Sequence, residues 1–185
     1  MAKRNTDRRT QRTRQALMAA FVELVLARGY EDVGIGEIIR KANIGRSTFY
    51  LHYASKEALL KASLEHPSDQ LAACVAGEVT PQLLAPLLDH FREQRTVNRV
   101  FFEHPIRTVW VKSLAALIEP RLAGIAHAGG ARPPIPRRLT ALVVAEMQVA
   151  LITHWLTGKF SLKSEVVAAA LIANTRRTLA GASPG

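Results

Sequence analysis

The sequence predicts an all-α protein with a small N-terminal domain and a larger C-terminal domain. Its 185 residues are 48% hydrophobic but only 6% aromatic, so the core must be aliphatic and rich in alanine, which favours helices over a β-sandwich. Apolar residues recur at three- and four-residue spacing, and no strand pattern or internal repeat breaks that spacing. We place the two domains at residues 1–62 and 63–185.

The charge of the chain points to an anionic partner. Its formal net charge is +10 and its pI is about 10.5, which suggests nucleic acid first and a membrane surface second. Residues 1–61 hold 12 Lys and Arg against 6 Asp and Glu, so the excess is densest in the smaller domain.

Residues 1–11 are predicted to be a disordered basic arm that runs into the first helix. Such an arm could reach over phosphates or into the minor groove, with an affinity that falls as salt rises. A solvated tail with generic attraction explains the same residues equally well. The basic side chains of the arm and of the helix start are Lys3, Arg4, Arg8, Arg9, Arg12 and Arg14.

Two helices and a tight turn follow this arm. The first helix is predicted over residues 12–28 and ends at Gly29, a left-handed cap. The second is short, and the run Asn43-Ile44-Gly45 breaks it, because Asn and Gly tolerate left-handed or extended backbone. The core-facing stripes of these two helices are Leu17, Ala20, Phe21, Leu24 and Val25, then Ile35, Ile38 and Ile39.

Residues 46–52 are predicted to form another short helix. At about two turns it cannot be stable alone, so packing must hold it, with Phe49 as the inward anchor. Ser55 caps the next helix, and Lys56 beside that N-terminus adds a second anion-attracting group. Phosphates and base edges accept bonds from donors of the kind that the short helix offers, which are Arg46, Ser47, Thr48, Tyr50 and His52.

Residues 12–62 resemble the DNA-binding domain of TetR-type transcriptional regulators. The resemblance rests on Gly29-Tyr30, Ile38–Ala42, Ser47–Tyr53 and Ser55–Leu59, which agree in spacing and residue type. The sequence departs from the family at two helix starts. Gly34 stands where a threonine is usual, and Asn43-Ile44-Gly45 stands where Gly-Val-Ser is usual.

The resemblance implies a role for each residue at the matching positions. Thr48, Tyr50, His52 and Lys56 fall where the family contacts the phosphate backbone. Arg46 and Ser47 fall at the start of the recognition helix, where bases are read. It further implies a homodimer on a palindromic operator, most simply a repressor that a small effector releases from DNA. A cytoplasmic, nucleoid-associated protein is expected, because the N-terminus is polar with no apolar run behind it.

The remainder of the chain is predicted to be helical as well. Pro67 should end the helix that starts after Ser55, and Pro120 should end or kink a later one. The other predicted elements are helices at 69–76, from Pro81, at 97–102, 105–119, 137–156 and 164–179, a loop at 127–136 and a turn at 158–161. Ser164 is the expected cap of the last helix.

The last two helices are predicted to form a dimer interface. The helix 137–156 is apolar nearly all round, and the helix 164–179 carries alanines that let another helix approach closely. Pairing both with their two-fold copies would bury the excess apolar surface as a four-helix interface. The expected interface residues are Leu139, Val143, Met147, Ala169 and Ala173.

A small hydrophobic or aromatic effector is expected in the C-terminal domain. Pockets for such molecules are mostly apolar, with a few placed polar groups. The alternative, favoured for any single one of these aromatic residues, is that they simply form the core. The candidate lining residues are Phe91, Phe101, Phe102, His104, Trp110, Met147, His154 and Trp155.

The sequence argues against an enzyme. It has no glycine-rich phosphate loop, no nucleophile elbow and no metal-ligand spacing, so we predict no catalytic activity, no cofactor and no metal site. The lone cysteine, Cys74, excludes an intramolecular disulfide and is expected to be a buried core residue rather than a redox sensor.

Two further classes of protein are weighed against the regulator. The N-terminus has no signal peptide, and residues 139–156 are not expected to span a membrane because they carry Glu146, Gln148 and His154. The remaining alternative is a basic helical protein that coats DNA or an anionic membrane surface without an effector. A coat needs charge but no capped reading helix, so the turn and recognition-helix pattern favours a sequence-specific regulator.

Overall fold

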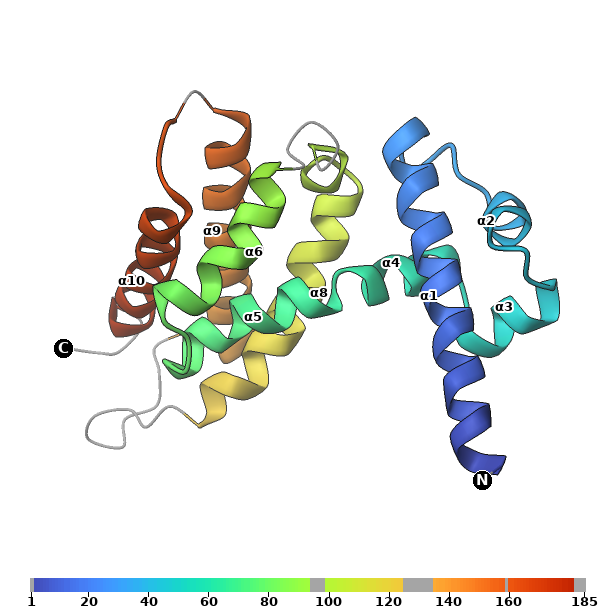
Figure 1. Ribbon diagram of the computed structural model, residues 1–185. Coiled ribbons are helices and arrows are strands. Elements are labelled where there is room, and N and C mark those ends of the chain that lie inside the picture. Colours follow the sequence, from blue (N-terminus) through green and yellow to red (C-terminus); the bar gives the residue numbers. More distant parts are fainter. Residues whose placement is uncertain (1, 94–98, 125–134, 159, 182–185) are drawn as a thin grey trace. The chain divides into compact units, whose positions relative to one another are not determined.

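The computed structural model describes residues 2–93, 99–124, 135–158 and 160–181, and within those ranges every regular element is a helix (Figure 1). The chain divides into two compact units, Met1–Ser63 and Leu64–Gly185. We refer to them as the N-terminal unit and the C-terminal unit. The all-α fold predicted from composition and periodicity is confirmed.

Four helices make up the N-terminal unit. They are α1 (Ala2–Arg28), α2 (Ile35–Ala42), α3 (Arg46–His52) and α4 (Lys56–Ser63). The long helix α1 packs against α2 and α4, and α2 packs against α3. The core that joins them consists of the fully or nearly fully buried side chains of Leu17, Phe21, Val25, Val33, Ile38, Phe49, Leu59 and Leu60.

The predicted disordered arm is wrong, because α1 begins at Ala2 rather than near Arg12. Residues 2–11 contain no glycine or proline, so nothing in the sequence stops a helix there. Arginine, lysine and glutamine are good helix formers, and the continuing helix needs no apolar face at this end. The basic residues from Lys3 onward therefore belong to the first helix.

The turns of the N-terminal unit follow the sequence prediction. Gly29 ends α1 with a φ of 86°, and Asn43 ends α2 in the left-handed region with a φ of 54°. The amide of Asn43 donates to the carbonyl oxygen of Arg40 at 3.1 Å, and Gly45 then opens α3 in extended conformation. These backbone angles fix the direction in which the chain enters α3.

The predicted helix from Ser55 to Pro67 is two helices. α4 ends at Ser63, and α5 (Glu65–Ala76) takes Pro67 into its first turn. A proline is tolerated there, because the amides of the first turn have no intrahelical partner to lose. The predicted start of α5 at Asp69 is also wrong, because α5 begins at Glu65 and accommodates Pro67 in its first turn.

The C-terminal unit contains the other helices. They are α5, α6 (Pro81–Glu93), the 3₁₀ turn η1 (Arg99–Phe102), α8 (Ile106–Ala123), α9 (Arg137–Thr157) and α10 (Ser164–Gly181). α8 packs along α9 and α5, and α10 packs against α6, α9 and α5. The core of this unit is aliphatic apart from a few aromatic rings, as the composition predicts.

Several predicted boundaries in this unit are confirmed and one is not. Gly77 ends α5 with a φ of 75°, and Pro81 opens α6. α8 continues through Pro120 to Ala123, because Pro120 and Ala116 one turn before it are both exposed and water can solvate the carbonyl that the proline leaves free. Most of the predicted loop 127–136 lies outside the described residues, which resume at 135. Residues 97–98 of the predicted short helix lie wholly outside them.

Ser164 does not cap α10. Its side chain is buried, and its Oγ donates to Oδ1 of Asp89 at 2.6 Å. The first amides of α10 instead donate to the carbonyl oxygen of Lys163, at 3.0 and 3.2 Å. Asp89 also accepts from Arg92 at 2.8 Å, so this carboxylate ties the start of α10 to α6.

Polar side chains of α9 bond to neighbouring helices. Among the described helices, α9 alone is long and apolar enough to cross a membrane, and half of that window is buried within the unit. Nε2 of Gln148 donates to the carbonyl oxygen of Leu71 at 3.2 Å and to Oγ1 of Thr175 at 3.0 Å, and Glu146 forms an ion pair with Arg107. These bonds are those of a core helix.

Cys74 occupies the place predicted for it. Its side chain is buried in α5, and burial raises the pKa of the thiol to about 11. A thiol that stays protonated is a poor nucleophile and a poor metal ligand, so Cys74 acts as a small apolar core residue.

We expect Gly158→Ala to destabilise the C-terminal unit by about 1–3 kcal/mol. An added Cβ at this position would lie 2.5 Å from the carbonyl oxygen of His154 and 2.6 Å from the ring of Phe160. Urea unfolding followed by tryptophan fluorescence measures the effect, because both tryptophans lie in this unit.

Gly124→Ala is the matched control. Its Cβ would meet only the carbonyl oxygen of Arg121, at an ordinary contact distance of 3.7 Å, and its backbone is helical. We expect no loss of stability in this variant. Equal midpoints for the two variants would contradict the steric explanation.

Candidate nucleic-acid interface and partner surface

The helix α3 presents the predicted DNA contacts outward. Its one fully buried side chain is Phe49, which anchors the helix in the core and makes an edge-on contact with the ring of Tyr50, with centroids 5.3 Å apart. Arg46 and Ser47 are exposed, Tyr50 is 46% exposed, and Thr48 and His52 are half-buried. The guanidinium of Arg46 lies 5.9 Å from the centroid of the Tyr50 ring, within reach of a cation–π contact.

Lys56 makes contacts within the N-terminal unit that the sequence did not predict. Its ammonium donates to the carbonyl oxygens of Tyr30 at 2.8 Å and Val33 at 2.9 Å, and it lies 4.2 Å from the centroid of the Tyr30 ring. These partners belong to the loop between α1 and α2. Lys56 therefore holds that loop against the start of α4.

A second brace closes the other side of the same loop. The amide of Gly34 donates to Oε2 of Glu37 at 3.0 Å, and Arg28 donates to Oε1 of the same carboxylate at 2.8 Å. The bond from Gly34, followed by the bond from Arg28, lowers the pKa of the Glu37 carboxyl. Glycine at the N-cap has no side chain to offer, and Glu37 supplies part of the missing cap.

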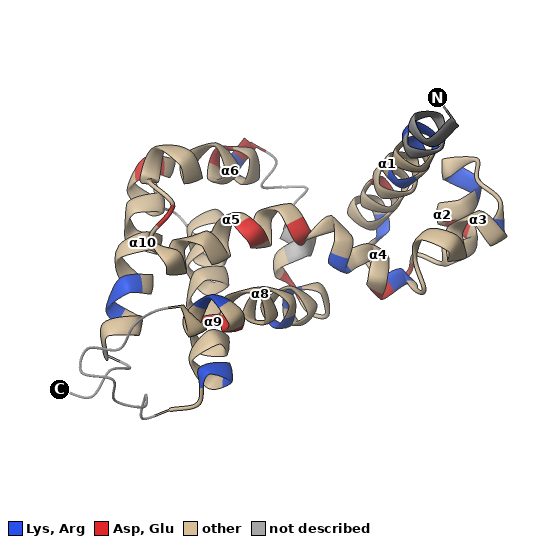
Figure 2. Ribbon diagram, turned by 90° about the horizontal axis from the view of Figure 1, so that it is seen from below, with Lys and Arg blue, Asp and Glu red and all other residues tan. Residues whose placement is uncertain are grey.

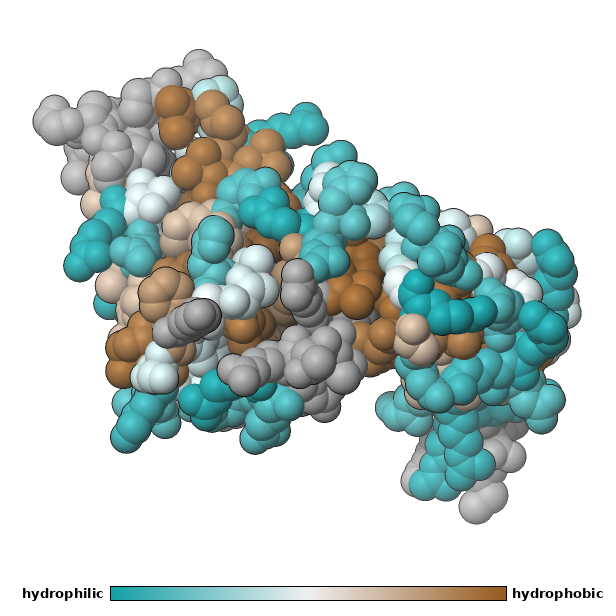
Figure 3. Space-filling model, turned by 90° about the horizontal axis from the view of Figure 1, so that it is seen from above, coloured by the Kyte–Doolittle hydropathy of each residue, from teal (hydrophilic) through white to brown (hydrophobic). Residues whose placement is uncertain are grey.

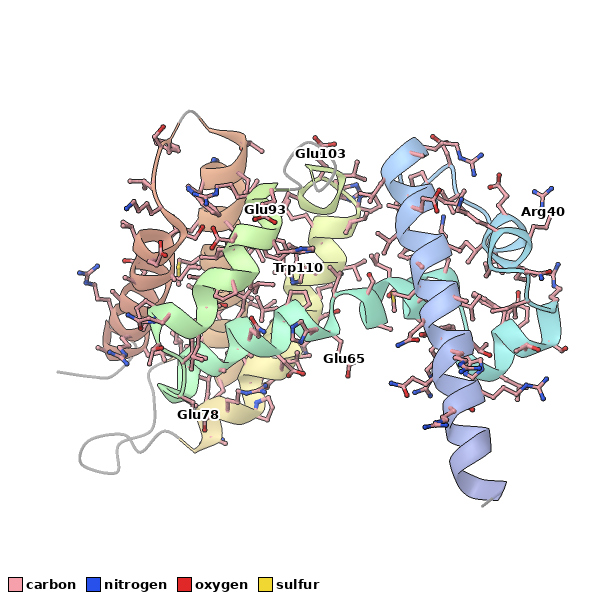
Figure 4. The ribbon with its side chains drawn as sticks, viewed as in Figure 1. Arg40, Glu65, Glu78, Glu93, Glu103 and Trp110 are labelled. Atoms are coloured by element: carbon pink, nitrogen blue, oxygen red, sulfur yellow. The ribbon has the colours of Figure 1, made fainter. Side chains whose placement is uncertain are left out.

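Other basic side chains of the N-terminal unit add to the charge of this region. Figure 2 shows Lys and Arg along α1 and around α2 and α3. Arg40 projects away from α2 (Figure 4), while Lys41 is paired with Glu23 at 2.7 Å. The exposed basic residues described on the first half of α1 are Arg8, Arg9, Arg12 and Arg14.

Sequence reasoning missed one residue on the outer side of α3. Leu51 is exposed and was not among the predicted contacts, because leucine is normally assigned to a core. Its position in the helix, four residues after Ser47 and two after Phe49, is the only sequence signal that could have marked it.

A separate apolar surface lies on the C-terminal unit (Figure 3). The predicted interface residues Leu139 and Val143 are exposed, and Met147 is half-buried four residues further along α9. On α10, Ala169 is exposed and Ala173 is half-buried. The exposed apolar side chains that sequence reasoning missed in α10 and the segment before it are Phe160, Leu162 and Val166.

The structure brings together only part of the predicted effector site. The rings of Phe91, Phe102 and Trp110 pack against one another, with centroids 5.2 to 5.9 Å apart. Nε1 of Trp110 donates to Oγ of Ser68 at 3.1 Å, which fixes the indole between α5 and α8 (Figure 4). These three rings form one aromatic cluster.

The other predicted lining residues lie elsewhere. His104 and His154 are exposed, and Met147 shares the outer stripe of α9 with Val143. Trp155 is buried and donates to the carbonyl oxygen of Leu162 at 3.2 Å, so it closes the turn before α10. The side chain of Phe101 lies outside the described ones. Periodicity could not separate these positions because α9 is apolar on several sides.

Three buried side-chain atoms of the C-terminal unit have no hydrogen-bond partner among the described residues: Oε1 of Gln70, Oγ of Ser113 and Oε1 of Gln148. Both N–H groups of the Gln148 amide are used, toward Leu71 and Thr175, while its Oε1 is buried without a hydrogen bond. The carbonyl of Leu71 can only accept, so it fixes which end of the amide faces it. Within the described ranges, no three His, Cys, Asp or Glu side chains are placed to hold a metal ion.

We expect Lys56→Ala to destabilise the N-terminal unit by about 1–3 kcal/mol, because two backbone carbonyls lose their bonds to the ammonium. Thermal unfolding followed by circular dichroism measures the loss. Lys41→Ala is the control: it removes a surface ion pair worth at most about 1 kcal/mol. If both variants keep the wild-type midpoint, the ammonium of Lys56 does not hold the loop.

Comparison with known proteins identifies the N-terminal unit. Residues 17–63 match the family described as bacterial regulatory proteins, tetR family. A Bacillus subtilis (strain 168) protein, the uncharacterized HTH-type transcriptional regulator YxbF, is 47% identical over 60 residues, which cover 32% of this chain and 16% of that protein. The chain thus spans well under two thirds of the length of the curated relatives that it matches first.

Solved structures share the fold of nearly the whole chain. A TetR transcriptional regulator from Streptococcus agalactiae 2603V has a TM-score of 0.58 and 23% identity, covering 94% of this chain and 98% of that chain. Thermus thermophilus FadR, a TetR-family transcriptional repressor solved in complex with lauroyl-CoA, has a TM-score of 0.53 and 19% identity, covering 93% and 99%. The helix-turn-helix unit thus matches the tetR family of bacterial regulatory proteins in sequence, and the likeness of the whole chain to these solved structures is one of fold.

Proposed function

We propose that the protein is a sequence-specific DNA-binding transcriptional regulator that acts as a ligand-responsive repressor in the cytoplasm, at the nucleoid. The observation that carries this proposal is the presentation of α3. A helix of seven residues is anchored by Phe49, entered through the left-handed turn at Asn43, and exposes Arg46 and Ser47. A helix held in this way suits insertion into the major groove.

The proposed contacts divide into those that position the protein and those that read sequence. Thr48, Tyr50 and His52 donate to phosphates, while Arg46 and Ser47 face base edges. Lys56 acts indirectly, because its bonds to the Tyr30 loop keep α4 in place beside α3. The basic residues at the start of α1 add phosphate contacts, so that the affinity for DNA falls more steeply as the salt concentration rises.

The competing function is a non-specific coat on DNA or an anionic membrane surface. Such a coat requires charge alone, whereas the N-terminal unit orients a short helix through Phe49, Asn43 and the braces at Glu37 and Lys56. That orientation favours sequence-specific recognition of DNA over non-specific coating. Protection of one DNA site, as opposed to uniform salt-sensitive binding, separates the two functions.

We propose that the protein acts as a homodimer through α9 and α10. The supporting observation is the exposed apolar stripe of Leu139 and Val143 on α9, with Val166 and Ala169 exposed on α10. Two-fold pairing of these helices buries that surface and gives a symmetric protein for a palindromic operator. The reading helices of such dimers lie about 34–36 Å apart, one turn of DNA.

The proposed effector is a small hydrophobic or aromatic molecule bound in the C-terminal unit. The aromatic cluster of Phe91, Phe102 and Trp110 offers apolar surface, and Oε1 of Gln148 offers a buried acceptor without a partner among the described residues. The complex of Thermus thermophilus FadR with lauroyl-CoA supports a ligand with a large apolar part. The effector must bind the DNA-incompetent state more tightly than the competent one, since otherwise it shifts no equilibrium.

Selection of bound fragments from genomic DNA tests the main proposal and supplies the operator. On the selected site we expect Arg46→Ala to cost about 1–3 kcal/mol and to relax base preference locally. Tyr50→Phe keeps the ring beside Arg46 and removes only the hydroxyl, so it should weaken binding to all sequences alike. An unchanged base preference in Arg46→Ala would remove this residue from the set of readers.

The dimer is tested by placing a charge on the outer stripe of α9. We expect Val143→Glu to sediment as a monomer and to bind the operator weakly, because two like charges at a two-fold interface cost several kcal/mol. Leu83→Glu, at an exposed position of α6, is the control and should remain dimeric. A wild-type protein that sediments as a monomer at micromolar concentration would refute the dimer itself.

A further inference from the structure

Leu51 has an unusual environment for a leucine. Its side chain is 82% exposed, more than any other large apolar side chain for which exposure is described. A lone exposed leucine on an ordinary surface needs no explanation. Leu51, however, lies in the seven-residue helix α3, whose outer side is the proposed reading surface.

The geometry of α3 places Leu51 at the middle of that outer side. An α-helix turns about 100° per residue, so Ser47 and Leu51 lie within about 40° of each other and roughly opposite Phe49. Tyr50 falls on one flank of this line, with Arg46 beside it at the first residue of the helix, and Thr48 and His52 fall on the other. The exposures agree, because Leu51 is 82% exposed, Tyr50 is 46% exposed, and Thr48 and His52 are half-buried.

The flanking residues decide what Leu51 meets. The phosphates run along both edges of the major groove, so a helix whose two flanks donate to phosphates directs its middle line at the base edges. Ser47 and Leu51 form that line. The placement rests on the proposed function, in which Thr48, Tyr50 and His52 take the phosphates.

The chemistry of leucine then selects the base. The major-groove edges present hydrogen-bond donors and acceptors, and the C5 methyl of thymine is their one apolar group. Against guanine or adenine, a leucine would cover polar atoms and give them no partner, which is unfavourable. We propose that Leu51 is a specificity-determining residue, which selects thymine at one position of each operator half-site by contact with the C5 methyl.

The test begins with a selection from random-sequence duplex DNA by the wild-type protein, which gives the thymines favoured in each half-site. Each favoured thymine is then replaced singly by uracil, which differs only in lacking the methyl. We expect one replacement to weaken wild-type binding about fourfold, the effect of one buried methyl group. At that position, 5-methylcytosine should bind more tightly than cytosine by a similar factor.

Variants tie the methyl to Leu51. Leu51→Ala should bind the thymine and uracil duplexes equally, and Leu51→Met, which stays apolar, should keep most of the preference. Leu83→Ala, a truncation at another exposed leucine, should keep the full wild-type ratio. Circular dichroism of each variant establishes that it is folded, which an 82% exposed side chain leads us to expect.

The outcomes separate this inference from the proposed function. A wild-type protein that enriches a sequence but binds every uracil duplex as tightly as thymine overturns the role of Leu51 and leaves the regulator intact. A methyl preference that survives in Leu51→Ala overturns it as well. A wild-type protein that enriches no sequence overturns both.

Discussion

The ammonium of Lys56 is the contact on which the N-terminal unit depends. It draws the carbonyl oxygens of Tyr30 and Val33, and the ring of Tyr30, to one point at the start of α4. A seven-residue helix cannot hold itself, so α3 depends on what fixes the chain on either side of it. The left-handed Asn43 fixes its entry, and the position of α4 fixes its exit. These contacts give α3 a fixed orientation within the unit, and not charge alone.

The path from α2 to α3 could be predicted from sequence because its signals are local. Asn43 and Gly45 mark the turn, and the spacing of Ile38 and Phe49 marks the buried side. The role of Lys56 could not be predicted in this way. A lysine at a helix start suits a phosphate outside and a carbonyl inside equally well, and the choice depends on a loop 26 residues earlier in the chain. Resemblance to a family gives the position of this lysine but not its bonds to that loop.

The C-terminal unit shows where pattern reasoning fails and why. Periodicity predicts its helices, but it wrongly predicts helix ends at Pro67 and Pro120, because a first turn and an exposed face both tolerate proline. Sequence also predicts Ser164 as a cap, but its buried hydroxyl bonds to the carboxylate of Asp89 instead. The effector residues were chosen by type, and type cannot separate the packed ring of Trp110 from the outward side chain of His154. Only tertiary packing assigns each face of α9.

Gln148 lies on α9, the helix that packs inward against α5 and α10 and carries the exposed Leu139 and Val143 on its outer side. Its amide joins α9 to α5 and α10, and its Oε1 is left without a partner among the described residues. A buried acceptor in that condition costs about 1–3 kcal/mol, which a ligand with an N–H or O–H group would recover and a pure hydrocarbon would not. The same helix carries Leu139 and Val143 on its outer side. A donor bound to Gln148 would therefore act on the helix that carries the proposed dimer interface, so the proposed effector site and the proposed dimer would share one element.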